Sequence, residues 1–300
     1  MLLVHFLLTI YSNAKMLSGD IQTTLGGRYI AIDVYPYDFK EFLMADNTDF
    51  TSKSILSTKG KAEILKQFNN YFYFGGFPES TILSSKRDYL TSIYQKIFLG
   101  DIITRHTISN AFALKILFKK LAESVKQPIS FTRLANIIAS TGAKIGTNTV
   151  INYIDYAKDA WLITPIQNIV SKIIDKETNP KYYFTDNGLL NLFLLDGNTS
   201  LLENLVALTL LRKYGRNDAV YFYNKGIEVD FYVPDAQLAI QVSYNLNDAK
   251  TRKREITALL QLSKRVEVKK SLIITKDEEG TISENGINIE VIPIWKWLLH

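Results

Sequence analysis

Two neighbouring segments in the last third of the chain carry polar side chains that could together hold a metal ion. Glu228 and Asp230 alternate with apolar residues, and so do Gln241 and Ser243 after an intervening turn at residues 234–237. An alternation of period two is typical of strands, so each pair is expected on one face of its strand. Two carboxylates can bind Mg²⁺, but a hydrolytic site also needs charge that activates water. The second segment offers only an amide and a hydroxyl, so the sequence predicts acids without a neighbouring cation.

The composition excludes several other catalytic chemistries. The chain has 300 residues and no cysteine, which rules out disulfides, thiolate zinc sites and cysteine nucleophiles. Its three histidines, His5, His106 and His300, are too widely spaced to predict a histidine metal cluster or a Ser–His–Asp triad. Hydrophobic residues make up 47% of the chain, which predicts a globular protein, and this length corresponds to two domains of roughly 150 residues each.

Basic charge is concentrated close to the acids. Residues 248–270 contain eight basic and three acidic side chains, an excess equal to the net charge of +5 of the whole chain. Four of the basic residues lie at the start of a predicted helix: Lys250, Arg252, Lys253 and Arg254. Such a cluster can attract a polyanion such as nucleic acid. A solvated helix face is the alternative interpretation.

The elements that must position these residues form an α/β pattern over residues 187–300. The predicted elements are a helix at 201–214, strands at 221–223, 228–233 and 238–244, a helix at 248–262, strands at 271–275 and 288–292, and an aromatic C-terminal segment at 294–299. Alternating helices and strands predict a mixed α/β unit. Glu203 lies near the start of the first helix, where a carboxylate also has a purely structural interpretation as favourable charge for the helix dipole. Strand alternation places Val229 and Phe231 together on the face opposite the two acids.

Residues 128–186 have the pattern of a winged helix. Two short helices joined by a turn precede two apolar strands at 161–170 and 181–185, which are expected to pair as a wing. The second helix carries Asp155 and Asp159, and these acids would repel phosphates. We therefore expect this unit to contact a protein partner, a second copy of the chain or a neighbouring domain rather than to read DNA.

The first part of the chain is expected to contain a strand followed by long amphipathic helices. Residues 1–10 are apolar, but they lack the positive start of a secretory signal and are too short to span a bilayer, so a buried strand is predicted. Helices are predicted at 86–106 and 109–124. No membrane association and a cytoplasmic location are expected.

With these elements placed, the chain resembles the C-terminal part of a prokaryotic AAA-type ATPase family. Members of that family carry a P-loop domain, a winged helix and a PD-(D/E)xK nuclease-like domain of unknown function. The resemblance rests on these segments, in family order: residues 12–18 (SNAKMLS), 27–29 (GRY), 35–42 (YPYDFKEF), 75–79 (GGFPE), 183–189 (YFTDNGL), 203–206 (ENLV), 228–231 (EVDF) and 293–297 (PIWKW). It implies a bacterial protein with four parts: an ATPase-core remnant (1–45), a helical lid with linker helices (46–127), the winged helix (128–186) and the nuclease-like domain (187–300).

The chain departs from that family at the nucleotide site. The family's P-loop lies upstream of residues 12–18, and no Gly-x-x-x-x-Gly-Lys-Ser/Thr sequence occurs in this chain, so ATP is not expected to bind to the chain alone. By resemblance, Asn13 corresponds to the sensor that contacts the γ-phosphate, and Arg28 to an arginine that faces phosphate or packs. Both are interpreted as structural remnants of a core shortened at its N-terminus.

The nuclease motif is also altered. In the resembled nuclease fold, Glu203 and Asp230 correspond to metal-binding acids, whereas Gln241 and Ser243 replace the second acid and the lysine that orients water. This predicts a non-catalytic or regulatory binding protein that holds nucleic acid or a protein partner. The alternative is a weak Mg²⁺-dependent nuclease that uses Glu203, Glu228 and Asp230. No other cofactor is expected.

Overall fold

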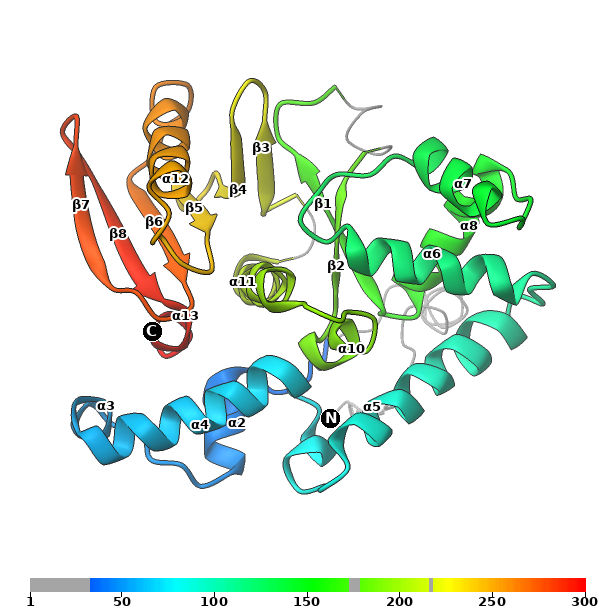
Figure 1. The fold of residues 1–300 in the computed structure, drawn as a ribbon, viewed down its shortest axis with the longest axis horizontal. Helices are drawn as coiled ribbons and strands as arrows, with labels where there is room; N and C mark the ends of the chain where they lie inside the picture. The colour runs from blue at the N-terminus through cyan, green and yellow to red at the C-terminus, as the bar shows by residue number, and fades with distance from the viewer. Residues whose placement is uncertain (1–32, 173–178, 216–217) are drawn as a thin grey trace, which may run out of the picture.

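The computed structural model describes residues 33–172, 179–215 and 218–300, and its centre is an eight-stranded sheet (Figure 1). The strand order is β2-β1-β3-β4-β5-β6-β8-β7. The strands are β1 (Ile163–Asn168), β2 (Lys181–Phe184), β3 (Tyr221–Asn224), β4 (Glu228–Val233), β5 (Leu238–Val242), β6 (Lys270–Thr275), β7 (Gly280–Glu284) and β8 (Ile287–Pro293). Neighbours are parallel in the pairs β1–β3, β5–β6 and β6–β8 and antiparallel in the other four. The protein is therefore of mixed α/β class, as the sequence predicts.

Helices cover the sheet, and those that precede β1 in the chain also extend away from it as a helical arm (Figure 1). They are α2 (Phe39–Ala45), α3 (Ser52–Leu56), α4 (Thr58–Phe74), the 3₁₀ turn η1 (Pro78–Thr81), α5 (Lys86–Gln95), the π-helix η2 (Lys96–Thr104), α6 (Ala111–Glu123), α7 (Phe131–Ser140), α8 (Thr147–Asp159), α10 (Asn187–Asn191), α11 (Asn198–Tyr214), α12 (Ala249–Leu262) and α13 (Ile294–Trp297). The single helix expected over residues 86–106 is thus an α-helix that continues as a π-helix.

The two faces of the sheet are buried by different helices. Adjacent residues of one strand alternate between them: Ile240 belongs to a large core shared with α11 and α4, whereas Ala239 belongs to a smaller core with α12. This two-sided burial explains why β5 and β6 read as nearly continuous apolar runs. Figure 1 shows α11 and α12 at different places along the sheet.

The two strands expected as a wing belong to the main sheet. Residues 163–166 of β1 pair with β2 in antiparallel register. Gln167 and Asn168 then pair in parallel with β3. Segments expected in two separate parts, 128–186 and 187–300, therefore share one sheet, and β2 lies close to the strands that carry the predicted pocket.

Local signals account for most helix starts. Asp38 forms a capping box with Glu41 at the start of α2, and Ser130 caps α7 by accepting a hydrogen bond from the Arg133 N–H. The β7–β8 hairpin was not expected from the sequence. Its turn contains Asn285 and Gly286, both with positive φ, which is a common pair in tight hairpins.

An interlock around Asp186 fixes the end of α4 against α10. One carboxylate oxygen of Asp186 accepts hydrogen bonds from the N–H groups of Gly188 and Leu189, and the other accepts from the Gly76 N–H at 2.8 Å. Gly75 has φ 73°, and a Cβ there would lie 2.0 Å from the Asp186 carboxylate. Burial raises the pKa of Asp186 to about 6, although the three N–H donors act in the opposite direction. Only glycine fits at position 75.

The N-terminal expectations lie largely outside the described residues. Asn13, Arg28 and the strand over residues 1–10 are among them. Within the part of the chain that the structure describes, no helix is both long and apolar enough to cross a bilayer.

Candidate functional site: an acid–lysine cluster

A buried lysine lies at the centre of the predicted acid pocket. The Lys181 Nζ is 3.4 Å from Glu203 Oε1, 3.2 Å from Glu228 Oε1 and 3.5 Å from Asp230 Oδ1, and its side chain is 0% exposed. We call these four residues the acid–lysine cluster. Burial alone would lower the pKa of Lys181, but the three carboxylates raise it overall, so this ammonium stays charged. The expectation that no cation neighbours the acids was therefore wrong.

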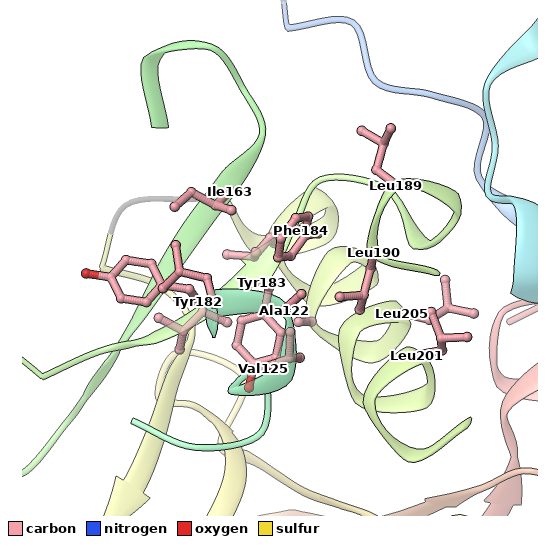
Figure 2. Close-up of a cluster of buried hydrophobic side chains, with 14 of the residues drawn as sticks. Ala122, Val125, Ile163, Tyr182, Tyr183, Phe184, Leu189, Leu190, Leu201 and Leu205 are labelled. Atoms are coloured by element: carbon pink, nitrogen blue, oxygen red, sulfur yellow. The ribbon is translucent and has the colours of Figure 1, made fainter. Parts of the chain in front are cut away.

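The lysine comes from the strand that was assigned to the wing. β2 pairs with β1, and Lys181 and Tyr183 point toward α11, where the Tyr183 hydroxyl donates a 2.8 Å hydrogen bond to Glu203 Oε1. The Tyr183 ring also lies 5.6 Å from that of Phe231 on β4. Figure 2 shows Tyr183 and Phe184 beside the leucines of α10 and α11. The only hint in the sequence is a lysine at the start of an otherwise apolar strand.

Glu203 is the most deeply buried acid of the cluster. Its side chain is 4% exposed. Burial raises its pKa to about 7, while Lys181 and the Tyr183 hydroxyl act to lower it and Asp230 raises it further. The excess of three carboxylates over one ammonium therefore makes the cluster responsive to protons near neutral pH.

The stability of the protein is expected to fall as pH rises from about 5 to about 8. The pKa values of Glu203 and Asp186, about 7 and about 6, lie above their usual values of 4.5 and 3.8. In that interval the folded state binds more protons than the unfolded state, so stabilisation present at low pH is lost as pH passes through 6 and 7. A shift of roughly two units corresponds to about 3 kcal/mol. Urea unfolding across this range tests the slope, and Glu203→Gln should flatten its upper part. A free energy of unfolding that increases with pH would contradict the prediction.

Gln241 does not serve as a free ligand in the pocket. Its Oε1 accepts from the Asp230 N–H at 2.9 Å, and its Nε2 donates to the Glu228 carbonyl at 3.1 Å. The Val242 N–H in turn donates to Asp230 Oδ2 at 2.9 Å. Gln241 therefore bonds the β4 backbone where the β4–β5 ladder ends, just beyond the Phe231–Ile240 pair.

β4 contains a β-bulge in its pairing with β3. Tyr221 pairs with Tyr232, but Tyr223 pairs with Val229, so β4 has one extra residue. As a result Val229 packs in the α12-side core and Phe231 in the α11-side core, whereas strict alternation placed both on one face. The bulge lets Asp230 and Phe231 both reach toward α11.

Ser243 also lies outside the cluster. Its hydroxyl donates to the Asn245 carbonyl at 2.8 Å, within the loop that follows β5. Of the five residues expected in the pocket, the structure brings together Glu203, Glu228 and Asp230 and leaves Gln241 and Ser243 with local structural contacts.

The cluster does not fit a magnesium ion as it is arranged. The carboxylates that would bind the metal instead surround the Lys181 ammonium, and both oxygens of Asp230 have protein donors. Within residues 33–172, 179–215 and 218–300, no group of three or more His, Cys, Asp or Glu side chains is arranged to hold a metal. In place of a divalent ion, the protein supplies its own monovalent cation.

The predicted basic residues all lie on the exposed surface of α12. They are Lys250, Arg252, Lys253 and Arg254, and we call them the α12 basic face. Arg254 binds Glu255 through Nε at 3.1 Å and Nη2 at 2.5 Å. This pair and the charges of Asp230 and Glu228 raise the pKa of Arg254. The α12 basic face therefore lies within electrostatic reach of the acid–lysine cluster.

Comparison with known proteins shows the family. The family described as "Domain of unknown function (DUF8612)" matches residues 65–214, half of the chain. The chain belongs to the DUF8612 family. It is 33% identical over 300 residues to "Uncharacterized protein MJ1544" of Methanocaldococcus jannaschii, covering 96% of this chain and 67% of that protein. It is 31% identical over 296 residues to an "Uncharacterized protein" of Haemophilus influenzae, covering 96% and 70%. No solved structure matches the chain significantly.

The DUF8612 match contains half of the cluster. It includes Lys181 and Glu203 but ends before Glu228 and Asp230. In this DUF8612 protein the cluster therefore forms only when the matched region packs against the strands that follow it.

Proposed function

We propose that this DUF8612 protein is a non-catalytic, regulatory binding protein of the cytoplasm, related to AAA-type ATPases, whose nuclease-like C-terminal part holds nucleic acid. The observation that carries the proposal is the ammonium of Lys181 within 3.5 Å of three carboxylates. These acids neutralise an internal cation, so they are not available to activate water through a metal. Binding without turnover is the function that this arrangement supports best.

The α12 basic face supplies the binding surface. Lys250, Lys253 and Arg254 are spaced at i, i+3 and i+4, so they lie along one side of the helix. They lie in its first half, where the helix dipole also favours anions. Side chains of this kind bind phosphates without reading sequence. We therefore expect affinity for the nucleic-acid backbone, with strong salt dependence.

The α7–α8 unit has a different role in this proposal. Asp155 on α8 pairs with Lys158 at 2.8 Å, which removes one exposed cation from the phosphate-facing candidates of that helix. Together with Asp159, this supports contact with a protein partner or a second copy of the chain rather than with DNA.

Binding should depend on the α12 basic face and on salt. Fluorescence anisotropy with a labelled duplex of about 20 base pairs should show affinity that falls steeply with salt, and replacing all four basic residues by alanine should weaken binding by at least about tenfold. The matched control is Lys115→Ala with Lys119→Ala, two exposed lysines of α6. Equal loss in both variants, or no binding by the wild-type protein, would overturn the proposal.

A weak Mg²⁺-dependent nuclease remains the second candidate. Lys181 supplies beside Glu203 and Asp230 the cation that Ser243 cannot, but this function requires Mg²⁺ to displace the Lys181 ammonium from the carboxylates. Incubation of plasmid DNA with and without Mg²⁺ separates the two functions. Cleavage that requires Mg²⁺ and is lost in Asp230→Ala would establish the nuclease, whereas salt-sensitive binding without cleavage supports the binding protein.

A further inference from the structure

On α12, a buried carboxylate, that of Glu255, forms an ion pair with an exposed arginine, Arg254. The Glu255 side chain is 5% exposed and that of Arg254 is 72% exposed, yet two guanidinium nitrogens contact the same Glu255 oxygen. The exposed Arg254 side chain can therefore bind a phosphate from solvent, whereas the Glu255 carboxylate stays buried.

Arg254 is the cation that pairs with Glu255 in the described structure. Asp230 and Glu228 on β4 act on Glu255 through their charges, and both disfavour its ionised form. β5, which also packs against α12, carries no charged side chain over Leu238–Val242. Lys181 on β2 is already surrounded by the acids of the cluster. Burial raises the pKa of Glu255, and Arg254 is the group that lowers it.

We propose that binding of a nucleic-acid phosphate to Arg254 is coupled to protonation of Glu255. This inference rests on the proposed function and adds a regulation to it. If a phosphate binds the guanidinium in place of Glu255, a buried carboxylate is left unpaired within the electrostatic range of Asp230 and Glu228, which is strongly unfavourable. Uptake of one proton by Glu255 removes that charge. The bound state then carries more protons than the free protein, so affinity increases as pH falls.

The coupling of phosphate binding to protonation of Glu255 predicts the size and direction of a pH effect on affinity. One proton taken up on binding changes the affinity by at most about tenfold per pH unit. We expect affinity for the labelled duplex to be roughly three- to tenfold higher at about pH 6 than at about pH 8. Isothermal titration calorimetry in two buffers of different ionisation enthalpy should show net proton uptake on binding.

Two variants and a control test the coupling. Glu255→Gln removes the charge but keeps the shape, so it should bind as tightly at pH 8 as the wild-type protein does at about pH 6, with little pH dependence left. Arg254→Ala should bind more weakly and also lose the pH dependence. Glu267→Gln removes an exposed acid that follows the same helix and should keep the wild-type pH dependence.

The outcomes separate this inference from the proposed function. If the wild-type protein binds equally at both pH values and Glu255→Gln behaves like it, the coupling is overturned while nucleic-acid binding stands. If Glu255→Gln keeps the full pH dependence, another group takes up the proton and the coupling is overturned as well. If neither the wild-type protein nor any variant binds the duplex at either pH, the proposed function fails and this inference fails with it.

Discussion

Replacement of Lys181 by methionine is expected to lower the free energy of unfolding by about 3–5 kcal/mol. The substitution keeps the length of the side chain in a fully buried site but leaves Glu203 and Asp230 without their counterion. Glu228 is half-exposed and should contribute less, because water screens its charge. The loss should be larger at about pH 8 than at about pH 5, because protonation of Glu203 relieves the excess charge. Urea unfolding at the two pH values measures both effects.

A surface pair provides the control for this prediction. Lys158 pairs with Asp155 at 2.8 Å, with its side chain 36% exposed, so Lys158→Met should change stability by less than about 1 kcal/mol. Combining Lys181→Met with Glu203→Gln should recover part of the lost stability, since one of the unpaired charges is then absent. A Lys181→Met protein as stable as Lys158→Met would show that the ammonium does not hold the cluster together.

Replacement of Gly75 by alanine is expected to cost at least about 4 kcal/mol or to prevent folding. Gly75 has φ 73° and ψ −164°, a conformation available almost only to glycine. Its new Cβ would lie 2.0 and 2.2 Å from the two oxygens of Asp186, which is fixed by the N–H groups of Gly76 and Gly188. The carboxylate cannot move aside without losing these bonds. Soluble yield and urea unfolding measure the effect.

The variant Gly142→Ala is the control that distinguishes the cost of backbone strain from the cost of steric overlap. Gly142 has φ 89° but no atom within 4 Å of an added Cβ, so Gly142→Ala should cost only about 1–2 kcal/mol. If Gly75→Ala does not fold, Gly76→Ala offers a second test, because its Cβ would lie 2.1 Å from the Tyr37 carbonyl oxygen. Equal stability of the Gly75 and Gly142 variants would contradict the interlock around Asp186.

The interlock and the cluster share one consequence for function. Asp186 lies two residues after Phe184, the last residue of β2, and the same strand begins at Lys181. The interlock around Asp186 and the cluster lysine, Lys181, therefore lie at opposite ends of β2. A change that loosens β2 should disturb both, so the variants above need to be compared for nucleic-acid binding as well as for stability.

The sequence by itself determined the strands and helices that carry the site and the types of residue on them. Period-two alternation marked β4 and β5, and the excess of basic residues marked α12. Glu203, Glu228 and Asp230 were singled out as acids that belong together, and the structure places them within 3.5 Å of one lysine. These features are local, because each depends on side chains a few residues apart in the chain.

Only the tertiary structure decided which cation neutralises those acids and where Gln241 and Ser243 point. Lys181 is separated from Asp230 by 49 positions, and it reaches the site because β1 pairs with both β2 and β3, a long-range pairing that no local pattern specifies. The bulge in β4 arises in the same way, from the register between strands, and it turns Phe231 to the α11 side and directs Gln241 to the backbone. Sequence patterns report which residues can face the same way, whereas pairing and register fix which of them meet.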